Sequence, residues 1–182
     1  AVFGAQNEAA TCSDSATGLA AGWYCWLGDA FASVGSVGYD HKVMAIPARG
    51  AWESVRRHAA ALGKDAERDE LTVVGIGDMS GDVFGNGLLR SPHMKLVAAF
   101  DHRHVFIDPN PDPAVSFAER QRLFNLSRSS WADYDPALIS EGGGVYPRTL
   151  KTIELSEAAR KRLDADRASF APNELLTAIL RA

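Results

Sequence analysis

Two apolar segments joined by a short glycine-rich stretch constrain the fold of this chain more than any other feature. Residues 71–76 and 95–100 are rich in apolar and β-branched side chains and have the length of a strand. The eighteen residues between them, 77–94, suffice for a turn and a short crossover helix, which two parallel strands require. The pattern predicts a β-α-β unit and therefore an α/β fold.

The first of these segments ends in the run Gly75-Ile76-Gly77-Asp78-Met79-Ser80-Gly81. In a dinucleotide-binding turn the first glycine permits a tight turn and the second lets the backbone approach a pyrophosphate, which the following helix N-terminus favours. A single pattern of this kind is weak, because glycine-rich chains produce it by chance. The candidate cofactor contacts are Gly75, Gly77, Asp78, Met79 and Ser80.

A carboxylate, Asp101, ends the second segment and follows Gly77 by 24 residues. An acidic side chain near this offset accepts a hydrogen bond from an adenosine ribose hydroxyl, and its charge favours NAD over NADP by repelling the 2′-phosphate. Two alternatives stay open. In one, Asp101 only caps a loop and the glycines only turn the chain. In the other, the chain is a Rossmann-type methyltransferase, although Val73 and Val74 stand where such enzymes usually carry an acid.

Composition narrows the range of partners. The 182 residues are 46% hydrophobic and 23% charged, as in ordinary globular proteins. Lys and Arg number 19 against 23 Asp and Glu, so the net charge of −4 leaves no broad basic surface for nucleic acid. The most apolar stretch, 19–27, is far shorter than the ~20 residues of a membrane span. We expect neither nucleic acid nor membrane as a partner.

Cysteine and histidine usage predicts no metal site. Cys12 and Cys25 form neither a CxxC pair nor a disulfide framework, which fits a reducing, cytoplasmic location. The histidines His93, His102 and His104 lie near the second apolar segment without a neighbouring cysteine or a clear third ligand.

Helical patterns flank the β-α-β unit. Apolar spacing and capping signals predict helices over residues 15–33, 49–63, 116–124, 156–168 and 173–181. The helix over 116–124 is expected to open with the capping box Ser116-Phe117-Ala118-Glu119. Residues 125–148 look irregular. The expected fold is therefore a Rossmann-like β-α-β unit with flanking helices.

Several longer stretches carry distinctive patterns: residues 26–33, 35–42, 73–87, 99–104, 116–120, 128–135 and 141–148. In them the chain resembles the large bacterial NAD-specific glutamate dehydrogenases, of the glutamate/leucine/phenylalanine/valine dehydrogenase superfamily. The resemblance covers most of the chain from Ser13 onward. It implies oxidative deamination of L-glutamate to 2-oxoglutarate and ammonia, with hydride passing to NAD on a Rossmann domain, in an enzyme expected to be a homo-oligomer.

The resemblance also assigns residues and domains. Asp14 occupies the hinge position, where an Asp of the family handles protons at the reacting amine. Arg49 lies in Ala48-Arg49-Gly50, which is similar to the family's loop near the nicotinamide, and Pro47 stands where Thr is usual. Residues 1–63 are then the hinge and leading helices at the boundary with the catalytic domain. Residues 64–182 are the first part of the NAD-binding Rossmann domain.

The family's substrate lysines and its later Rossmann strands have no counterpart within these 182 residues. The resemblance therefore implies the cofactor-domain portion of the enzyme, with an incomplete doubly wound parallel sheet. The alternative function is a non-catalytic nucleotide-binding fragment, because hydride transfer needs substrate held against the nicotinamide.

Overall fold

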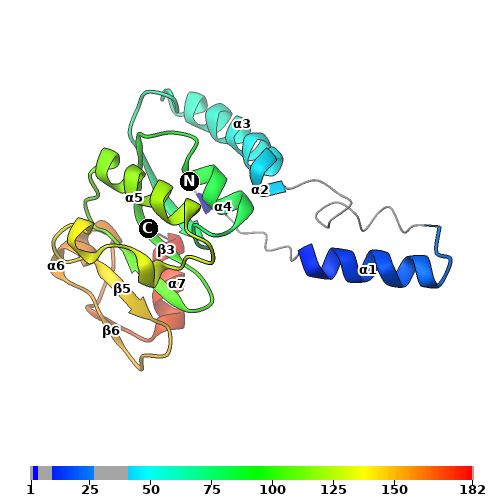
Figure 1. Cartoon of the computed structure of the whole chain (residues 1–182). Coiled ribbons are helices and arrows are strands. Elements are labelled where there is room, and N and C mark those ends of the chain that lie inside the picture. The colour runs from blue at the N-terminus through cyan, green and yellow to red at the C-terminus, as the bar shows by residue number, and fades with distance from the viewer. Residues whose placement is uncertain (1, 4–9, 27–40, 182) are drawn as a thin grey trace.

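A computed structural model describes residues 2–3, 10–26 and 41–181, and Figure 1 shows their arrangement. One mixed sheet has the strand order β1-β2-β3-β4-β5. Its strands are β1 (Val2–Phe3), β2 (Leu71–Ile76), β3 (Met94–Phe100), β4 (His104–Ile107) and β5 (Gly144–Pro147). Pairing is parallel from β1 to β3 and antiparallel from β3 to β5. Helices accompany the sheet, and the fold is α/β, as expected.

The predicted β-α-β unit is present. Helix α4 (Asp82–Leu88) connects β2 to β3, and these two strands pair in parallel. The observed β2 has the predicted bounds, and β3 begins one residue earlier than predicted. Six of the seven residues of β3 are buried. Such a nearly continuous apolar run is typical of a strand covered on both faces, as strands of a parallel sheet are.

The expectation of a wholly parallel sheet is wrong after β3. Strand β4 returns beside β3 in the antiparallel sense, with Ala99 opposite Phe106, and β5 continues this pattern. Only residues 101–103 separate β3 from β4. A parallel crossover needs a dozen or more residues, whereas a hairpin needs only a few, so the short connection dictates the antiparallel pairing.

Helices cover both faces of this sheet. One face carries α3 (Ile46–Ala61), α4 and α5 (Pro113–Asn125), with α2 (His41–Met44) packed on α3 and α4. The other face carries α6 (Glu157–Arg162) and α7 (Pro172–Arg181). A small hairpin of β6 (Ile153–Glu154) and β7 (Ser169–Phe170) joins the second face. The sheet therefore lies between two apolar cores.

Helix α1 (Ala10–Gly22) stands apart from this three-layered body (Figure 1). It covers part of the helix predicted over 15–33, of which residues 27–33 lie outside the described part of the chain. The turn that follows it carries three aromatic residues that are more than four-fifths exposed, Trp23, Tyr24 and Trp26. Among the described residues, no helix combines the length and the apolarity needed to cross a membrane.

Other predicted boundaries also differ from the structure. Helix α3 begins at Ile46 rather than Arg49 and ends at Ala61, and α7 begins at Pro172. Helix α5 begins at Pro113 rather than Ser116, because the Asp112 side chain accepts from two N–H groups of the first turn and Pro is well suited to a first helical position. The helix predicted over 156–168 ends at Arg162, and Asp164 follows with a φ of 47°. The irregular stretch 125–148 contains β5 and the short 3-10 helices η2 (Trp131–Asp133) and η3 (Pro136–Leu138).

Candidate functional site

The turn that follows β2 is centred on Gly77. Its φ of 135° lies in the region that L side chains rarely adopt, so this position favours glycine. The Gly77 N–H donates to the carbonyl of Phe100 at 2.7 Å, which ties the turn to the end of β3. Its carbonyl accepts from the indole N–H of Trp131 at 2.8 Å. Both polar groups of the Gly77 backbone are therefore fixed by other parts of the fold.

Gly75 has a different role from the one predicted. It lies inside β2, opposite Ala99, and not in the turn. A Cβ added there would overlap the ring of Phe84 on α4 and lie 2.7 Å from its Cζ atom. Gly85 is similar, since a Cβ there would lie 2.6 Å from the carbonyl oxygen of Met79. These two glycines allow α4 to pack closely against β2 and against the turn.

The other turn residues divide between the surface and the core. The Asp78 carboxylate accepts from the Ser80 N–H at 2.9 Å and from the Ser80 hydroxyl at 2.5 Å, and the Gly81 N–H donates to the Asp78 carbonyl at 3.3 Å. The Met79 side chain is 1% exposed and belongs to the core. Met79, its backbone included, is therefore enclosed in this structure.

Asp101 lies beside this turn and closes the β3–β4 hairpin. Its Oδ1 atom accepts from the N–H groups of Arg103 and His104, both at 2.6 Å. Asp101 thus does cap a loop, as one of the alternatives held. Its Oδ2 atom is buried and has no hydrogen-bond partner within the described residues. This second oxygen is unpaired but enclosed, so a bound ligand could reach it only if the surrounding atoms moved.

The structure does not bring Asp14 and Arg49 to this turn. Asp14 belongs to α1, which stands apart from the sheet in Figure 1, and its side chain lies outside the described part of the chain. Arg49 is exposed and lies in the first turns of α3. The stretch Ala48-Arg49-Gly50 is therefore helical, and its interpretation as a loop is wrong.

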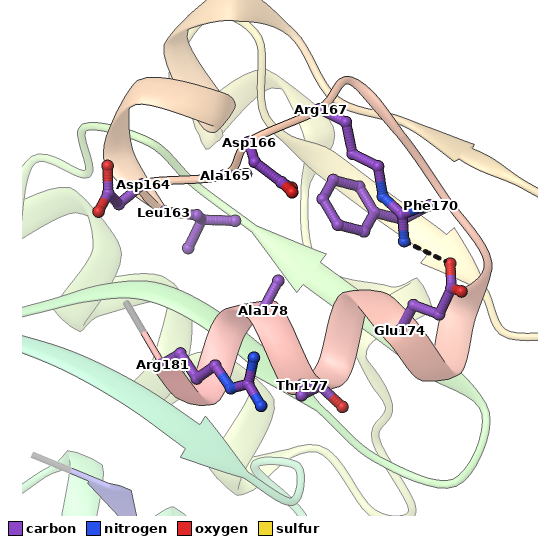
Figure 2. A pocket seen from close by; sticks show the side chains of 10 residues that line it. All are labelled: Leu163, Asp164, Ala165, Asp166, Arg167, Phe170, Glu174, Thr177, Ala178 and Arg181. Carbon is purple, nitrogen blue, oxygen red and sulfur yellow. Dashed lines mark hydrogen bonds and ion pairs between the residues drawn. The ribbon is translucent and has the colours of Figure 1, made fainter.

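A cavity of about 430 Å³ lies elsewhere in the body, between α7 and the segment that joins α6 to β7 (Figure 2). Its rim carries the ion pair of Arg167 and Glu174, 2.6 Å apart, and its wall includes the Phe170 ring. All its lining residues fall within 163–181, so it is separate from the glycine turn. Within the described ranges, no three His, Cys, Asp or Glu side chains are placed to hold a metal.

Sequence reasoning missed Trp131 and Gly85 at this site. The contact between Trp131 and Gly77 spans 54 residues, and no local pattern reveals a contact of that range. Trp131 does lie in the stretch 128–135, one of the stretches that resemble the family, but the resemblance assigned no role to it. Gly85 lies in 73–87, and its position on the face of α4 toward the turn is known only from the structure.

Comparisons with known proteins identify the family. A family model described as bacterial NAD-glutamate dehydrogenase, catalytic domain, matches residues 1–182. The chain is 60% identical over 187 residues to an NAD-specific glutamate dehydrogenase of Mycobacterium tuberculosis, covering 100% of the chain and 12% of that relative. It is 58% identical over 181 residues to the Pseudomonas aeruginosa enzyme, covering 100% of the chain and 11% of the relative. Identity to the Halomonas elongata enzyme is 55% over 179 residues, covering 98% of the chain and 11% of the relative.

The chain thus spans 11–12% of the length of these curated relatives. Because the family model matches all of its residues, the chain belongs to the bacterial NAD-glutamate dehydrogenase family, within the catalytic domain.

Proposed function

We propose that this chain is the cofactor-binding portion of an NAD-dependent enzyme that deaminates L-glutamate oxidatively to 2-oxoglutarate and ammonia. The observation that carries the proposal is the position of Asp101 beside the Gly77 turn, at the carboxyl ends of two parallel strands. Open α/β sheets bind their ligands at this edge. Membership in the family supports the choice of NAD and of glutamate.

The turn residues suit a dinucleotide through their backbone. Gly77 lets the main chain approach a pyrophosphate, and Gly75 and Gly85 leave room for α4 behind it. Asp78, Met79 and Ser80 follow Gly77, and the Asp78 N–H would be offered to the phosphates. The Ser80 N–H is engaged by the Asp78 carboxylate, and Met79 is buried, so these two would meet the cofactor only after the turn adjusts. NAD supplies the hydride acceptor. The chain supplies its binding and orientation, in what we propose to be the first part of a Rossmann domain over residues 64–182.

Asp101 is proposed to hold the adenosine ribose. Its Oδ1 atom is engaged by the hairpin, and its buried Oδ2 atom lacks a partner among the described residues. An unpartnered buried carboxylate oxygen is unfavourable in the unbound protein, so a hydroxyl donor would relieve it. The same negative charge would disfavour the 2′-phosphate of NADP.

Asp14 and Arg49 are proposed to act nearer the reaction, in the hinge region formed by residues 1–63. A general acid or base must come within hydrogen-bond reach of the reacting nitrogen, which gives Asp14 a role in proton transfer at the amine. Arg49 is proposed to lie near the nicotinamide. In the active enzyme, Asp14→Asn should lower the turnover number and leave NAD affinity unchanged, and a normal turnover number would exclude this role.

A second candidate is a non-catalytic nucleotide-binding segment. A methyltransferase is not proposed, since family membership argues against it. For the enzyme we propose a cytoplasmic homo-oligomer that binds glutamate and 2-oxoglutarate.

Calorimetric titration of the purified chain with NAD, and separately with NADP, tests the cofactor site. A glutamate-dependent NADH assay run beside it separates the two candidates. We expect NAD to bind more tightly than NADP. Turnover would favour the enzyme, and NAD binding without turnover would favour a segment that needs other parts for catalysis. Failure of NAD to bind would refute the proposed function of the chain.

Asp101 has a matched pair of variants. Asp101→Asn keeps an oxygen that accepts from the two hairpin N–H groups and removes the charge, whereas Asp101→Ala removes both. Loss of a hydrogen bond to a charged group corresponds to roughly tenfold weaker binding or more. We expect Asp101→Asn to lose NAD affinity to this extent while its melting temperature stays close to that of the unaltered chain. Unchanged NAD affinity in Asp101→Asn would remove the proposed ribose contact.

A further inference from the structure

The stretch 128–135 contacts the Gly77 turn through Trp131. This side chain is fully buried, and its indole N–H donates to the Gly77 carbonyl at 2.8 Å. The resemblance gave the stretch no role. Its contact with the turn is the feature that the proposed function leaves unexplained.

The hydrogen bond from Trp131 orients the whole Gly77–Asp78 peptide and not only the Gly77 carbonyl. A peptide unit is planar and trans, so the carbonyl of Gly77 and the N–H of Asp78 point in opposite directions. Because the carbonyl is held toward buried Trp131, the Asp78 N–H is directed away from Trp131. Within the described residues this N–H has no hydrogen-bond acceptor. The indole thus sets the direction of a backbone donor that is available to a ligand at the turn.

Trp131 is itself held firmly on several sides. Its ring stacks on Phe106 of β4 with centroids 4.7 Å apart and meets the edge of Phe84 at 5.8 Å. Ser130 and Asp133 form a reciprocal capping box around η2, which fixes the backbone on both sides of Trp131. A donor with so few alternative positions keeps its acceptor in place.

Phe84, which packs against Trp131, also contacts Gly75. Phe84 occupies the space that a side chain at Gly75 would take, and it packs edge-on against Trp131. Gly75 therefore contacts Phe84, Phe84 contacts Trp131, and Trp131 donates to Gly77. This closed set of contacts links the end of β2 to a segment more than fifty residues away.

We propose that Trp131 is a positioning residue for the dinucleotide turn, and that its indole N–H holds the Gly77–Asp78 peptide in the orientation that binds the NAD pyrophosphate. The inference rests on the proposed function, because it assumes that the turn binds NAD. Trp131 itself is behind the turn and does not touch the cofactor.

The test compares Trp131→Phe with Trp52→Phe by NAD titration of the full chain. Trp131→Phe retains an aromatic ring for the stacking with Phe106 and removes the N–H donor. Trp52 of α3 provides the matched control, since its indole N–H also makes one hydrogen bond, to Glu67 at 2.9 Å, in the segment before β2 and not to the turn after it. Both variants are titrated well below their melting temperatures, so that a loss of stability alone leaves the dissociation constant unchanged.

The expected result is a dissociation constant for NAD that rises roughly three- to tenfold in Trp131→Phe and stays unchanged in Trp52→Phe, as for the loss of one hydrogen bond. Equal NAD affinity in Trp131→Phe and the unaltered chain would overturn the positioning role alone. Absence of NAD binding by the unaltered chain would instead overturn the proposed function, and the positioning role with it.

A measurement on the unaltered chain keeps the test decisive where Trp131→Phe does not fold. In nitrogen-15 spectra, the indole N–H signal of Trp131 should shift when NAD is added, because its acceptor peptide meets the cofactor through Asp78. The indole signal of Trp52 should stay in place. A Trp131 signal that does not move while NAD binds would overturn the inference.

Discussion

Gly75→Ala should destabilise the chain although alanine is a small residue and β2 is a regular strand. The added Cβ would overlap the Phe84 ring and lie 2.7 Å from its Cζ atom. Phe84 is fully buried and meets Trp131 edge-on at 5.8 Å, so the ring has no free space into which it can move. The methyl group must therefore force α4 away from β2 or push Phe84 out of its preferred rotamer.

The expected loss follows from what extra methyl groups do in packed cores. Such overpacking typically costs about 1–3 kcal/mol in the free energy of unfolding. For a chain of this size, a loss of about 2 kcal/mol lowers the melting temperature by roughly 4–8 °C. Thermal and urea unfolding, followed by circular dichroism, measure both quantities.

Gly50→Ala is the control for the glycine change itself. Gly50 is exposed on α3, and a Cβ there would have no atom within 4 Å. Alanine in a helix is favoured over glycine by roughly 0.5–1 kcal/mol, so this variant should be slightly more stable than the unaltered chain. The two substitutions are chemically identical and are expected to have opposite effects.

A double-mutant cycle locates the origin of the loss. Phe84→Leu removes the ring atoms that the new methyl group meets, so Gly75→Ala should cost less than about 1 kcal/mol in that background. A Gly75→Ala variant that loses less than about 0.5 kcal/mol, or the same amount with and without Phe84, would refute the packing explanation.

Two further predictions concern α5. Asp112→Ala should lower the free energy of unfolding by about 1 kcal/mol in denaturant titrations, because the Asp112 side chain accepts from two N–H groups of the first turn. The pKa of the Glu119 carboxyl is below its ordinary value. Burial raises this pKa, but the Arg122 guanidinium, at 2.6 and 2.8 Å, and the Asp135 N–H together lower it by more. The unfolded state therefore binds a proton more readily, so stability should fall as the pH drops below about 4.5, and the slope should be smaller in Glu119→Gln. An equal acid slope in both chains would contradict this assignment.

Local patterns were sufficient for the central unit of the fold. The bounds of β2 agree with the prediction, and those of β3 differ by one residue, because runs of apolar and β-branched residues mark strands that are buried on both faces. The turn at Gly77 and the position of Asp101 beside it also follow from the order of strand, turn, helix and strand. These features depend on neighbours in the sequence or on the general rule for parallel strands.

Local capping signals were less reliable. The Ser116 to Glu119 pattern suggested a helix start, but Asp112 and Pro113 provide one earlier. A reciprocal capping box is found at Ser130 and Asp133, within a stretch that looked irregular. Several short polar residues in this part of the chain can cap a helix, and the packing of the body selects among them.

Only the tertiary structure decided how the turn is supported. Asp101 closes the β3–β4 hairpin with Oδ1, and its Oδ2 has no partner among the described residues. The sequence alone does not show which carboxylate oxygen is hydrogen-bonded. Gly75 is required by the Phe84 ring and not by a turn. Trp131 reaches Gly77 across 54 residues. The sequence by itself determined which segments become strands, because that depends on local composition. It did not determine which distant side chains meet, because that depends on how the two cores pack around the sheet.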